Sequence, residues 1–212
     1  DIKDASVAIQ GMGNVGSNAA RIFYHRDIKV VAVSDVSGGL YKKSGLDITD
    51  ISDYLETKGN LLKDYNAPGV EHITNEELLT CECDVLIPAA LENQITAEVA
   101  EKLKCSYIIE AANGPTSEAG DAVLENRGIP VIPDIFANCG GVIVSYFEWV
   151  QNIQELTWIR ERVNEMLADL MSKAFMDILS VKKECDCTFR MAAYIVALRK
   201  LVYAEEIKGI FP

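Results

Sequence analysis

Short apolar runs alternate along the chain with longer amphipathic stretches until about Gly141. The apolar runs have the length and β-branched content of buried strands, and the stretches between them have the spacing of helices with one apolar face. Strand and helix repeated in this order indicate a parallel sheet that carries helices on both faces. The expected strands are 6–10, 30–35, 84–89, 106–111 and 129–134, and the expected helices are 15–24, 47–57, 96–103 and 117–127.

After Gly141 the pattern of apolar positions becomes wholly helical. One long amphipathic stretch runs over residues 157–179, and another begins at Thr188. Neither an internal repeat nor a low-complexity linker interrupts the chain. We therefore expect a single domain over residues 1–212, with a sheet core in residues 1–150 and a helical extension in residues 151–212.

The composition is that of a globular protein, with 212 residues of which 49% are hydrophobic and 25% are charged. The net charge is −12 and no basic stripe stands out, so we expect no nucleic acid and no membrane as partner. No run of about 20 apolar residues and no secretory signal are found. The sequence starts at Asp1 on a strand-like segment, and we expect a fragment that lacks an upstream part.

Six cysteines include two Cys-x-Cys pairs. Neither pair has the usual Cys-x-x-Cys spacing of a zinc site or a histidine ligand nearby. We expect reduced thiols in a cytoplasmic protein and no metal site. The cysteines are Cys81, Cys83, Cys105, Cys139, Cys185 and Cys187.

The sequence GMGNVG has the G-x-G-x-x-G spacing, and it follows an expected strand and opens an expected helix. In this context Gly11 permits a tight turn, Gly13 lets a diphosphate approach the backbone, and Gly16 lets the helix pack close to the strand. The first helical residues, Asn14 and Val15, present unpaired N–H groups to phosphate charge. The motif indicates an NAD(P)-binding domain of the α/β class, with a Rossmann-type doubly wound and mostly parallel sheet and a C-terminal helical extension.

Asp35 lies at the end of the second expected strand, about 20 residues past the last glycine of the motif. A carboxylate at this position can accept hydrogen bonds from both ribose hydroxyls of NAD, and it would repel a 2′-phosphate. Ser37 follows it, and Lys42 and Lys43 come after in a loop from which a lysine could swing back to a 2′-phosphate. We expect NAD as cofactor, with NADP as the open alternative.

Three segments that pair small residues with amides fall at the carboxyl ends of expected strands: 88–96, 110–119 and 133–142. Small residues let a flat ring approach, and amides can bind a carboxamide. A turn, or a helix cap at Thr116, would explain any one segment alone. Three segments on one sheet edge indicate a shared ligand, which we expect to contact Ala89, Ala90, Asn93, Ala112, Asn113 and Asn138.

Read in order, the segments GMGNVG, PAALENQIT, EAANGPT and NCGGVIVSYFEW resemble the C-terminal domain of the glutamate, leucine, phenylalanine and valine dehydrogenases. Within this family they are most similar to the hexameric glutamate dehydrogenases. The resemblance implies reversible oxidative deamination of L-glutamate to 2-oxoglutarate and ammonia. It also implies a cleft to an N-terminal domain that is absent from this chain, and a homohexamer when the protein is complete.

The resemblance also assigns roles to the segment that starts at Asn138. This residue would lie beside the nicotinamide and the substrate, while Gly141 lets the backbone pass close to both. Val142 and Ser145 would line the pocket for the substrate side chain, and the glutamate enzymes use the matching serine to bind the side-chain carboxylate. The leucine, valine and phenylalanine enzymes have an apolar residue there, so Ser145 favours glutamate. A serine that bonds to a carbonyl of its own helix is the alternative.

The catalytic groups of the family, two lysines and an aspartate on the N-terminal domain, have no match here. We therefore assign no catalytic residue and expect this chain to bind a dinucleotide without turning over substrate. Cys139 stands where the family usually has alanine, which predicts a sensitivity to thiol reagents. The last helix would either return to the missing domain or cover the sheet. The alternatives for function are a leucine, valine or phenylalanine dehydrogenase and a nucleotide-sensing regulatory domain.

Overall fold

The computed structural model describes residues 4–208, and the chain forms two compact units, Asp1–Val131 and Ile132–Pro212. The first unit carries the sheet, and the second is helical. The boundary between the units follows Val131, whereas the sequence was expected to change from sheet core to helical extension at residue 150. The reason is that the short helix α6 (Asp134–Ala137) and the helix α7 (Gly140–Gln154) pack on the helices that follow them.

Within the described residues, seven strands form one sheet in the order β4-β3-β2-β1-β5-β6-β7. The central strand β1 pairs in parallel with β2 on one side and with β5 on the other, and β5 pairs in parallel with β6. Chain connections therefore leave β1 toward both edges, as in a doubly wound fold. The strands are β1 (Ser6–Gln10), β2 (Lys29–Asp35), β3 (Gly38–Tyr41), β4 (Glu71–Ile73), β5 (Val85–Pro88), β6 (Tyr107–Ile109) and β7 (Val131–Ile132).

The strands β3 and β4 were not expected from the sequence. β3 pairs antiparallel with β2, so that Asp35 faces Gly38, and β4 pairs antiparallel with β3. Residues 38–41 were expected to lie in a loop, because a run of two glycines has little of the β-branched character of a strand. Gly38 has a φ of 144°, which only glycine adopts readily, and this conformation turns the chain back along β2.

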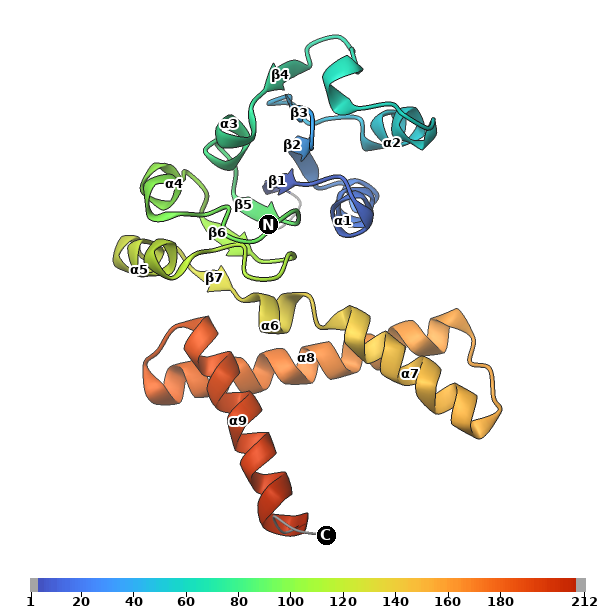
Figure 1. The fold of residues 1–212 in the computed structure, drawn as a ribbon, viewed down its shortest axis with the longest axis vertical. Coiled ribbons are helices and arrows are strands. Elements are labelled where there is room, and N and C mark those ends of the chain that lie inside the picture. The colour runs from blue at the N-terminus through green and yellow to red at the C-terminus, as the bar shows by residue number, and fades with distance from the viewer. Residues whose placement is uncertain (1–3, 209–212) are drawn as a thin grey trace. The chain divides into compact units, whose positions relative to one another are not determined.

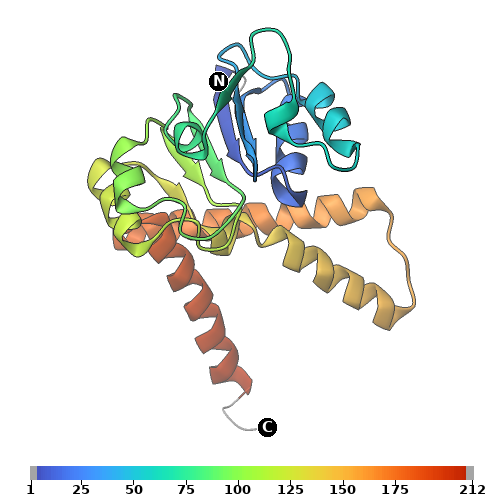
Figure 2. The same cartoon turned by 45° about the horizontal axis from the view of Figure 1, so that its top comes forward.

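Helices cover both faces of the sheet, as the alternation of elements predicts (Figure 1). One face packs on α1, α2 and the short 3-10 helix η2, through a core that includes Ile9, Val33 and Ile51. The other packs on α3, α4 and α5, through a core that includes Leu86 and Leu124. Figure 2 shows the same two layers from a second direction. These helices are α1 (Asn14–Tyr24), α2 (Ile48–Glu56), η2 (Leu62–Asp64), α3 (Asn75–Leu79), α4 (Ala97–Lys102) and α5 (Glu118–Arg127).

In the second unit, α7 is followed by α8 (Arg160–Cys185) and α9 (Phe189–Lys208). α8 packs against both α7 and α9, and the rings of Phe136, Phe175 and Phe189 stack in its core. Asp186, with a φ of 46°, turns the chain between the last two helices. None of the helices in residues 4–208 combines the length and the apolar character that crossing a bilayer requires.

Candidate functional site

A cavity of about 610 Å³ opens in the first unit at the carboxyl ends of β1, β2 and β5. Its position is the point where the chain connections diverge to the two sides of β1, which is where doubly wound sheets bind their ligands. The residues that line it come from the glycine-rich loop, the end of β2, the segment before η2 and the loop after β5. Those used below are Gln10, Gly11, Gly13, Ser34, Asp35, Val36, Leu61, Asn75, Ala89, Ala90 and Gln94.

The three glycines of the loop differ in their surroundings. Gly11 has a φ of 96°, and its N–H donates to the Ser34 hydroxyl at 3.2 Å, which fixes the loop to β2. A Cβ on Gly16 would lie 1.7 Å from the carbonyl oxygen of Gly11, so only glycine lets α1 start this close to β1. A Cβ on Gly13 would have no other atom within 4 Å. The open side of Gly13 leaves room for a diphosphate against the backbone.

The N-terminus of α1 lacks the side-chain cap that its neighbours have. Asp47, Thr74, Thr96 and Ser117 accept a backbone N–H at the start of α2, α3, α4 and α5 respectively. At α1 the capping position is Gly13, which has no side chain to accept one, and the first turn carries no acidic residue. The first N–H groups of a helix require an acceptor. A diphosphate fits this site because it can accept them and because it favours the positive end of the helix dipole.

Asp35 is half-buried at the rim of the cavity, and its carboxylate accepts hydrogen bonds from two backbone N–H groups and one hydroxyl. Its Oδ1 atom accepts from the N–H of Ser37 at 2.7 Å and from the Ser37 hydroxyl at 2.5 Å. Its Oδ2 atom accepts from the N–H of Leu62 at 2.9 Å. A carboxylate has about four acceptor positions. One position is left, so the expectation that Asp35 accepts from both ribose hydroxyls does not fit these contacts.

The expectation that Lys42 or Lys43 could reach a 2′-phosphate is wrong. β3 runs antiparallel to β2 and carries both lysines toward the other end of the sheet, where the N–H of Lys42 donates to the carbonyl of Val31. The Lys42 amine donates to the carbonyl of Pro68 at 3.1 Å. Neither lysine lines the cavity that holds Asp35. Sequence reasoning failed here because it treated the segment after Asp35 as a loop.

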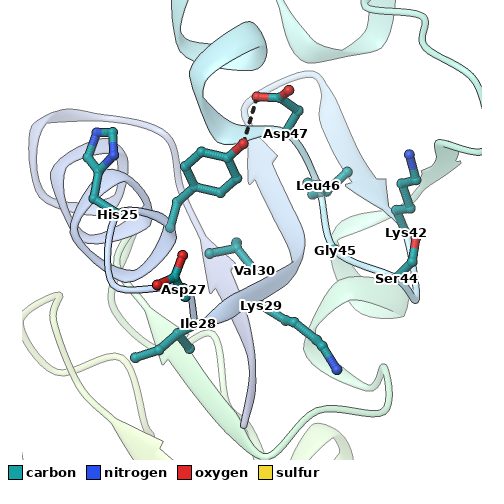
Figure 3. A pocket seen from close by; sticks show the side chains of 11 residues that line it. His25, Asp27, Ile28, Lys29, Val30, Lys42, Ser44, Gly45, Leu46 and Asp47 are labelled. Atoms are coloured by element: carbon teal, nitrogen blue, oxygen red, sulfur yellow. Dashed lines mark hydrogen bonds between the residues drawn. The ribbon is translucent and has the colours of Figure 1, made fainter. Parts of the chain in front are cut away.

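Lys42 instead lines a second hollow, of about 590 Å³, at the amino end of β2 (Figure 3). Tyr24 donates to Asp47 across this hollow at 3.3 Å. Figure 3 shows the amines of Lys29 and Lys42 pointing in different directions, with His25 on the far side. These charged groups do not converge on a common point, so the hollow lacks the arrangement that a ligand site needs.

The loops after β5 and β6 lie side by side, as expected. The N–H of Ala112 donates to the carbonyl of Pro88, and the N–H of Asn93 donates to the carbonyl of Gly114. Ala89 and Ala90 line the cavity directly. The neighbouring residues Asn93, Ala112 and Asn113 follow the same sheet edge, while Ser117, and not Thr116, caps α5.

Three amides at the floor of the cavity were not expected from the sequence. Gln10 is buried at the end of β1, and its Nε2 donates to Asn75 Oδ1 and to Gln94 Oε1 at 2.8 Å each. The network joins β1 to the start of α3 and to the loop after β5. The sequence did contain one indication of this network, namely the amide of Gln10 at the end of an otherwise apolar strand. A buried amide needs hydrogen-bond partners, so other polar side chains had to lie close to it.

The residues expected to meet the substrate lie in the second unit. Asn138 ends α6, and α7 then begins at Gly140 without a side-chain cap. A Cβ on Gly141 would meet nothing within 4 Å. Val142 is 74% exposed and Ser145 is exposed one turn later on the same face of α7. Among the residues that the structure describes, no hydrogen bond of the Ser145 hydroxyl to its own helix is found.

Comparisons with known proteins agree over the whole chain. The sequence matches the Glutamate/Leucine/Phenylalanine/Valine dehydrogenase family over residues 1–209. It is 49% identical to Glutamate dehydrogenase A2 of Halobacterium salinarum, over 100% of this chain and 50% of that protein. It is 44% identical to the NADP-specific glutamate dehydrogenase of Synechocystis sp., over 98% of this chain and 50% of that protein. It is also 44% identical to the NAD-specific glutamate dehydrogenase A of Halobacterium salinarum, over 100% of this chain and 48% of that protein.

Among solved structures, the hetero-hexameric glutamate dehydrogenase of Thermus thermophilus superposes with a TM-score of 0.91 at 29% identity, over 100% of this chain and 49% of that chain. The Peptoniphilus asaccharolyticus enzyme gives a TM-score of 0.82 at 34% identity, over 100% and 49%. The chain thus spans about half the length of the relatives it matches. Sequence motifs, fold and comparisons together show that it belongs to the Glutamate/Leucine/Phenylalanine/Valine dehydrogenase family.

Proposed function

We propose that this chain is the cofactor-binding half of a glutamate dehydrogenase, an oxidoreductase that converts L-glutamate reversibly to 2-oxoglutarate and ammonia with NAD(P). The observation that carries the proposal is the uncapped start of α1 beside the open face of Gly13, at the mouth of a cavity of about 610 Å³. The residues proposed to hold the cofactor are Gly11, Gly13, Asn14, Val15, Gly16, Asp35, Ala89, Ala90, Asn93, Ala112, Asn113 and Asn138.

The cofactor supplies the hydride chemistry, and the residues of this chain bind and orient it. The N–H groups of Asn14 and Val15 receive the diphosphate, and Asp35 accepts one hydroxyl of the adenosine ribose through its remaining position on Oδ2. NAD is the preferred cofactor in this proposal. Relatives with 44% identity include one named NAD-specific and one named NADP-specific, so similarity alone does not choose between them.

Glutamate is favoured as substrate over an apolar amino acid by the start of α7. Val142 and Ser145 are exposed on one face, where a hydroxyl can donate to a side-chain carboxylate. In a pocket built for leucine, the same hydroxyl would be left without a partner at a cost of about 1–3 kcal/mol. Asn138 and Gly141 complete the proposed substrate contacts. The leucine, valine and phenylalanine enzymes of the family are the second candidate, and Ser145 argues against them.

The general base and the groups that polarise the substrate carbonyl are proposed to lie in the other half of the complete protein. Asp134, at the start of α6, is the carboxylate of this segment that could be considered as a base. It already forms an ion pair with Arg190 at 3.7 Å and accepts a hydrogen bond from the N–H of Ile135 at 2.8 Å. We assign no catalytic residue to this chain. We also propose that the complete protein is a hexamer, since one structural neighbour is described as hetero-hexameric. That its subunits are identical and that it is cytoplasmic are proposals that rest on the sequence and on the family resemblance.

The test is an assay of the full-length protein, in which NADH oxidation is followed at 340 nm with ammonium and either 2-oxoglutarate or 4-methyl-2-oxopentanoate. We expect turnover with 2-oxoglutarate only. Turnover with the branched oxo acid alone would overturn the substrate assignment and leave the cofactor site intact. Absence of turnover with both, together with normal NADH binding, would favour a nucleotide-sensing domain.

A further inference from the structure

Three of the six cysteines lie together at the amino ends of β5 and β6. Cys83 and Cys105 are buried, with 8% and 6% of their surface exposed, in the core that packs against α3, α4 and α5. Cys81 is half-buried and packs against the same core. The thiol of Cys83 donates a hydrogen bond to the sulfur of Cys81. The cluster therefore combines one thiol near solvent with a second thiol in direct contact behind it.

The two thiols of this contact differ in acidity. The hydrogen bond from Cys83 lowers the pKa of Cys81, and Lys104 acts in the same direction, whereas burial and Glu82 oppose them. The same hydrogen bond and burial raise the pKa of Cys83. Burial also raises the pKa of the neighbouring Tyr41, so its hydroxyl stays uncharged at neutral pH. Since the thiolate is the nucleophile, Cys81 is the attacking sulfur of the pair.

The cluster is open to a small reagent, and its backbone is free to adjust. Cys83 and Lys104 line a hollow of about 370 Å³ at the amino ends of the strands. The chain bends at Cys81 and Glu82, between the end of α3 and the start of β5. Two Cα atoms separated by one residue lie at most about 7 Å apart, and a disulfide spans about 4.4–6.8 Å between its Cα atoms. The bend shortens the separation, so the sulfurs can be joined without unwinding a helix or a strand.

We propose that Cys81 and Cys83 form a site of oxidative modification, at which hydrogen peroxide converts the two thiols into a disulfide. The site lies at the opposite ends of the strands from the cavity proposed for the dinucleotide, and it does not depend on that proposal. It requires only the contact between the two thiols and the access of a small oxidant.

The reaction has two steps, and hydrogen peroxide is the oxidant. The Cys81 thiolate attacks one peroxide oxygen, so that an S–O bond forms, the O–O bond breaks, and hydroxide leaves. The product is a sulfenic acid on Cys81. The Cys83 sulfur then attacks the Cys81 sulfur, the S–S bond forms, the S–O bond breaks, and the departing hydroxide takes the Cys83 proton and leaves as water. Overall, two thiols and one hydrogen peroxide give one disulfide and two waters.

Tryptic peptides of the full-length protein test the proposal. Trypsin releases residues 64–102 as one peptide whose cysteines are Cys81 and Cys83, and Cys105 falls in a different peptide. The protein is treated with hydrogen peroxide, and the remaining thiols are then blocked with iodoacetamide in denaturant. We expect this peptide to carry no label and to be lighter by two hydrogen atoms. Dithiothreitol before the blocking step should restore both labels.

Two variants separate the roles of the thiols. Cys83→Ser keeps a hydrogen-bond donor for Cys81 but removes the second sulfur, so the sulfenic acid should persist and react with dimedone about tenfold more than in the unmodified protein. Cys105→Ser is the matched control, because Cys105 is buried in the same core. It should leave the disulfide between Cys81 and Cys83 unchanged.

The second Cys-x-Cys pair is an internal control in the same digest. Cys185 is exposed at the end of α8, whereas Cys187 packs against the core of the helical unit. Their side chains therefore have different surroundings, and we expect no disulfide between them under the same treatment. A disulfide in both pairs would show a reactivity common to any Cys-x-Cys sequence and would overturn the assignment to this cluster.

Other outcomes also decide against the site. Full labelling of both cysteines after peroxide treatment would overturn it, as would a disulfide that joins Cys81 to Cys105. A dimedone adduct on Cys105 and none on Cys81 in the Cys83→Ser variant would contradict the order of attack. Thermal unfolding checks that each variant folds, and where one does not, the peptides of the unmodified protein decide. Binding of NADH is measured separately, so a failure of the proposed function leaves this result unaffected.

Discussion

At the scale of single residues, substitutions of two glycines in the same motif should affect different properties, one the stability of the fold and the other the binding of NADH. Gly16→Ala places a Cβ 1.7 Å from the carbonyl oxygen of Gly11, so we expect a loss of about 3 kcal/mol or more in the free energy of unfolding. Gly13→Ala meets no atom within 4 Å and keeps an ordinary φ of −74°, so the fold should stay intact. Its methyl group would stand in the space proposed for the diphosphate, which should weaken NADH binding about tenfold, or 1.4 kcal/mol.

Thermal unfolding and NADH titration of the two variants measure these effects separately. A Gly13→Ala protein that unfolds early would show that this position is structural. A Gly13→Ala protein with unchanged NADH affinity would place the diphosphate away from the loop.

Ser145 makes a prediction about substrate choice in the full-length protein. Ser145→Val removes a hydroxyl that stands exposed beside Val142 on α7. We expect the KM for 2-oxoglutarate to rise about tenfold or more, because a hydrogen bond to a charged group is worth about 1.5–3 kcal/mol, and turnover of 4-methyl-2-oxopentanoate to increase. Asn152→Ala, exposed near the end of the same helix, is the control. An unchanged ratio of kcat/KM for the two oxo acids would contradict the assignment.

The cysteines of the first Cys-x-Cys pair should differ in reactivity. A hydrogen bond from Cys83 lowers the pKa of the Cys81 thiol, and Lys104 acts in the same direction. The contact with Cys81 and burial raise the pKa of Cys83, and burial raises that of Cys105 to about 11. Because the thiolate is the nucleophile, iodoacetamide at pH 7.5 should label Cys81 before Cys83 and Cys105, as read by peptide mass. Cys83→Ala should slow the labelling of Cys81, and equal rates at Cys81 and Cys105 would contradict the assignment.

At the scale of elements, hydrogen bonds join the amino ends of β1 and β5, two of the strands whose carboxyl ends border the cavity. The N–H and the hydroxyl of Ser6 both donate to Asp84 Oδ2 at 2.7 Å, and these bonds lower the pKa of Asp84. A carboxyl whose pKa is lower in the folded state contributes stability above its unfolded pKa of about 3.9, and it loses that contribution as the pH falls through the folded value.

Asp84→Asn should therefore destabilise the protein at pH 7 and have a diminishing effect as the pH falls below about 4. Urea unfolding at a series of pH values measures the difference from the unmodified chain. Asp53→Asn, at an exposed position on α2, should show little difference at any pH. A difference for Asp84→Asn that stays constant down to pH 2 would show that the bonds to Ser6 do not depend on its charge.

The elements also show what a sequence can and cannot predict. β1, β2 and β5 and the helices α1, α2, α4 and α5 were foreseen, since apolar runs and amphipathic stretches differ in period, whereas the short α3 and η2 were not. β3 was missed because its sequence, GGLY, offers one aliphatic side chain and two residues that disfavour strands. That one omission misplaced Lys42 and Lys43, because an antiparallel strand reverses the direction in which the chain leaves Asp35.

At the scale of the whole molecule, the candidate site too could be predicted from the sequence only in part. The position of the cavity could be predicted from the glycine motif, which follows β1, and from Asp35, which ends β2, because the carboxyl ends of these two parallel strands lie at the same edge of the sheet. The partners of Asp35 could not be foreseen in full, because the N–H of Leu62 comes from a segment 27 residues away that has no motif. Contacts of this kind depend on how η2 packs against β3, which is a property of the folded chain.

The two halves of the proposed enzyme lead to the last prediction. The cavity proposed for the dinucleotide lies in the first unit, yet the chain spans about half the length of its relatives and offers no match for the catalytic lysines and aspartate that the family resemblance implies. The isolated chain should therefore bind NADH, with thermal unfolding shifted to higher temperature, and produce no NADH from NAD and L-glutamate. The Gly13→Ala variant should show a smaller shift at the same NADH concentration, because tenfold weaker binding stabilises the folded chain less. Steady production of NADH by the purified chain would place a general base within these residues.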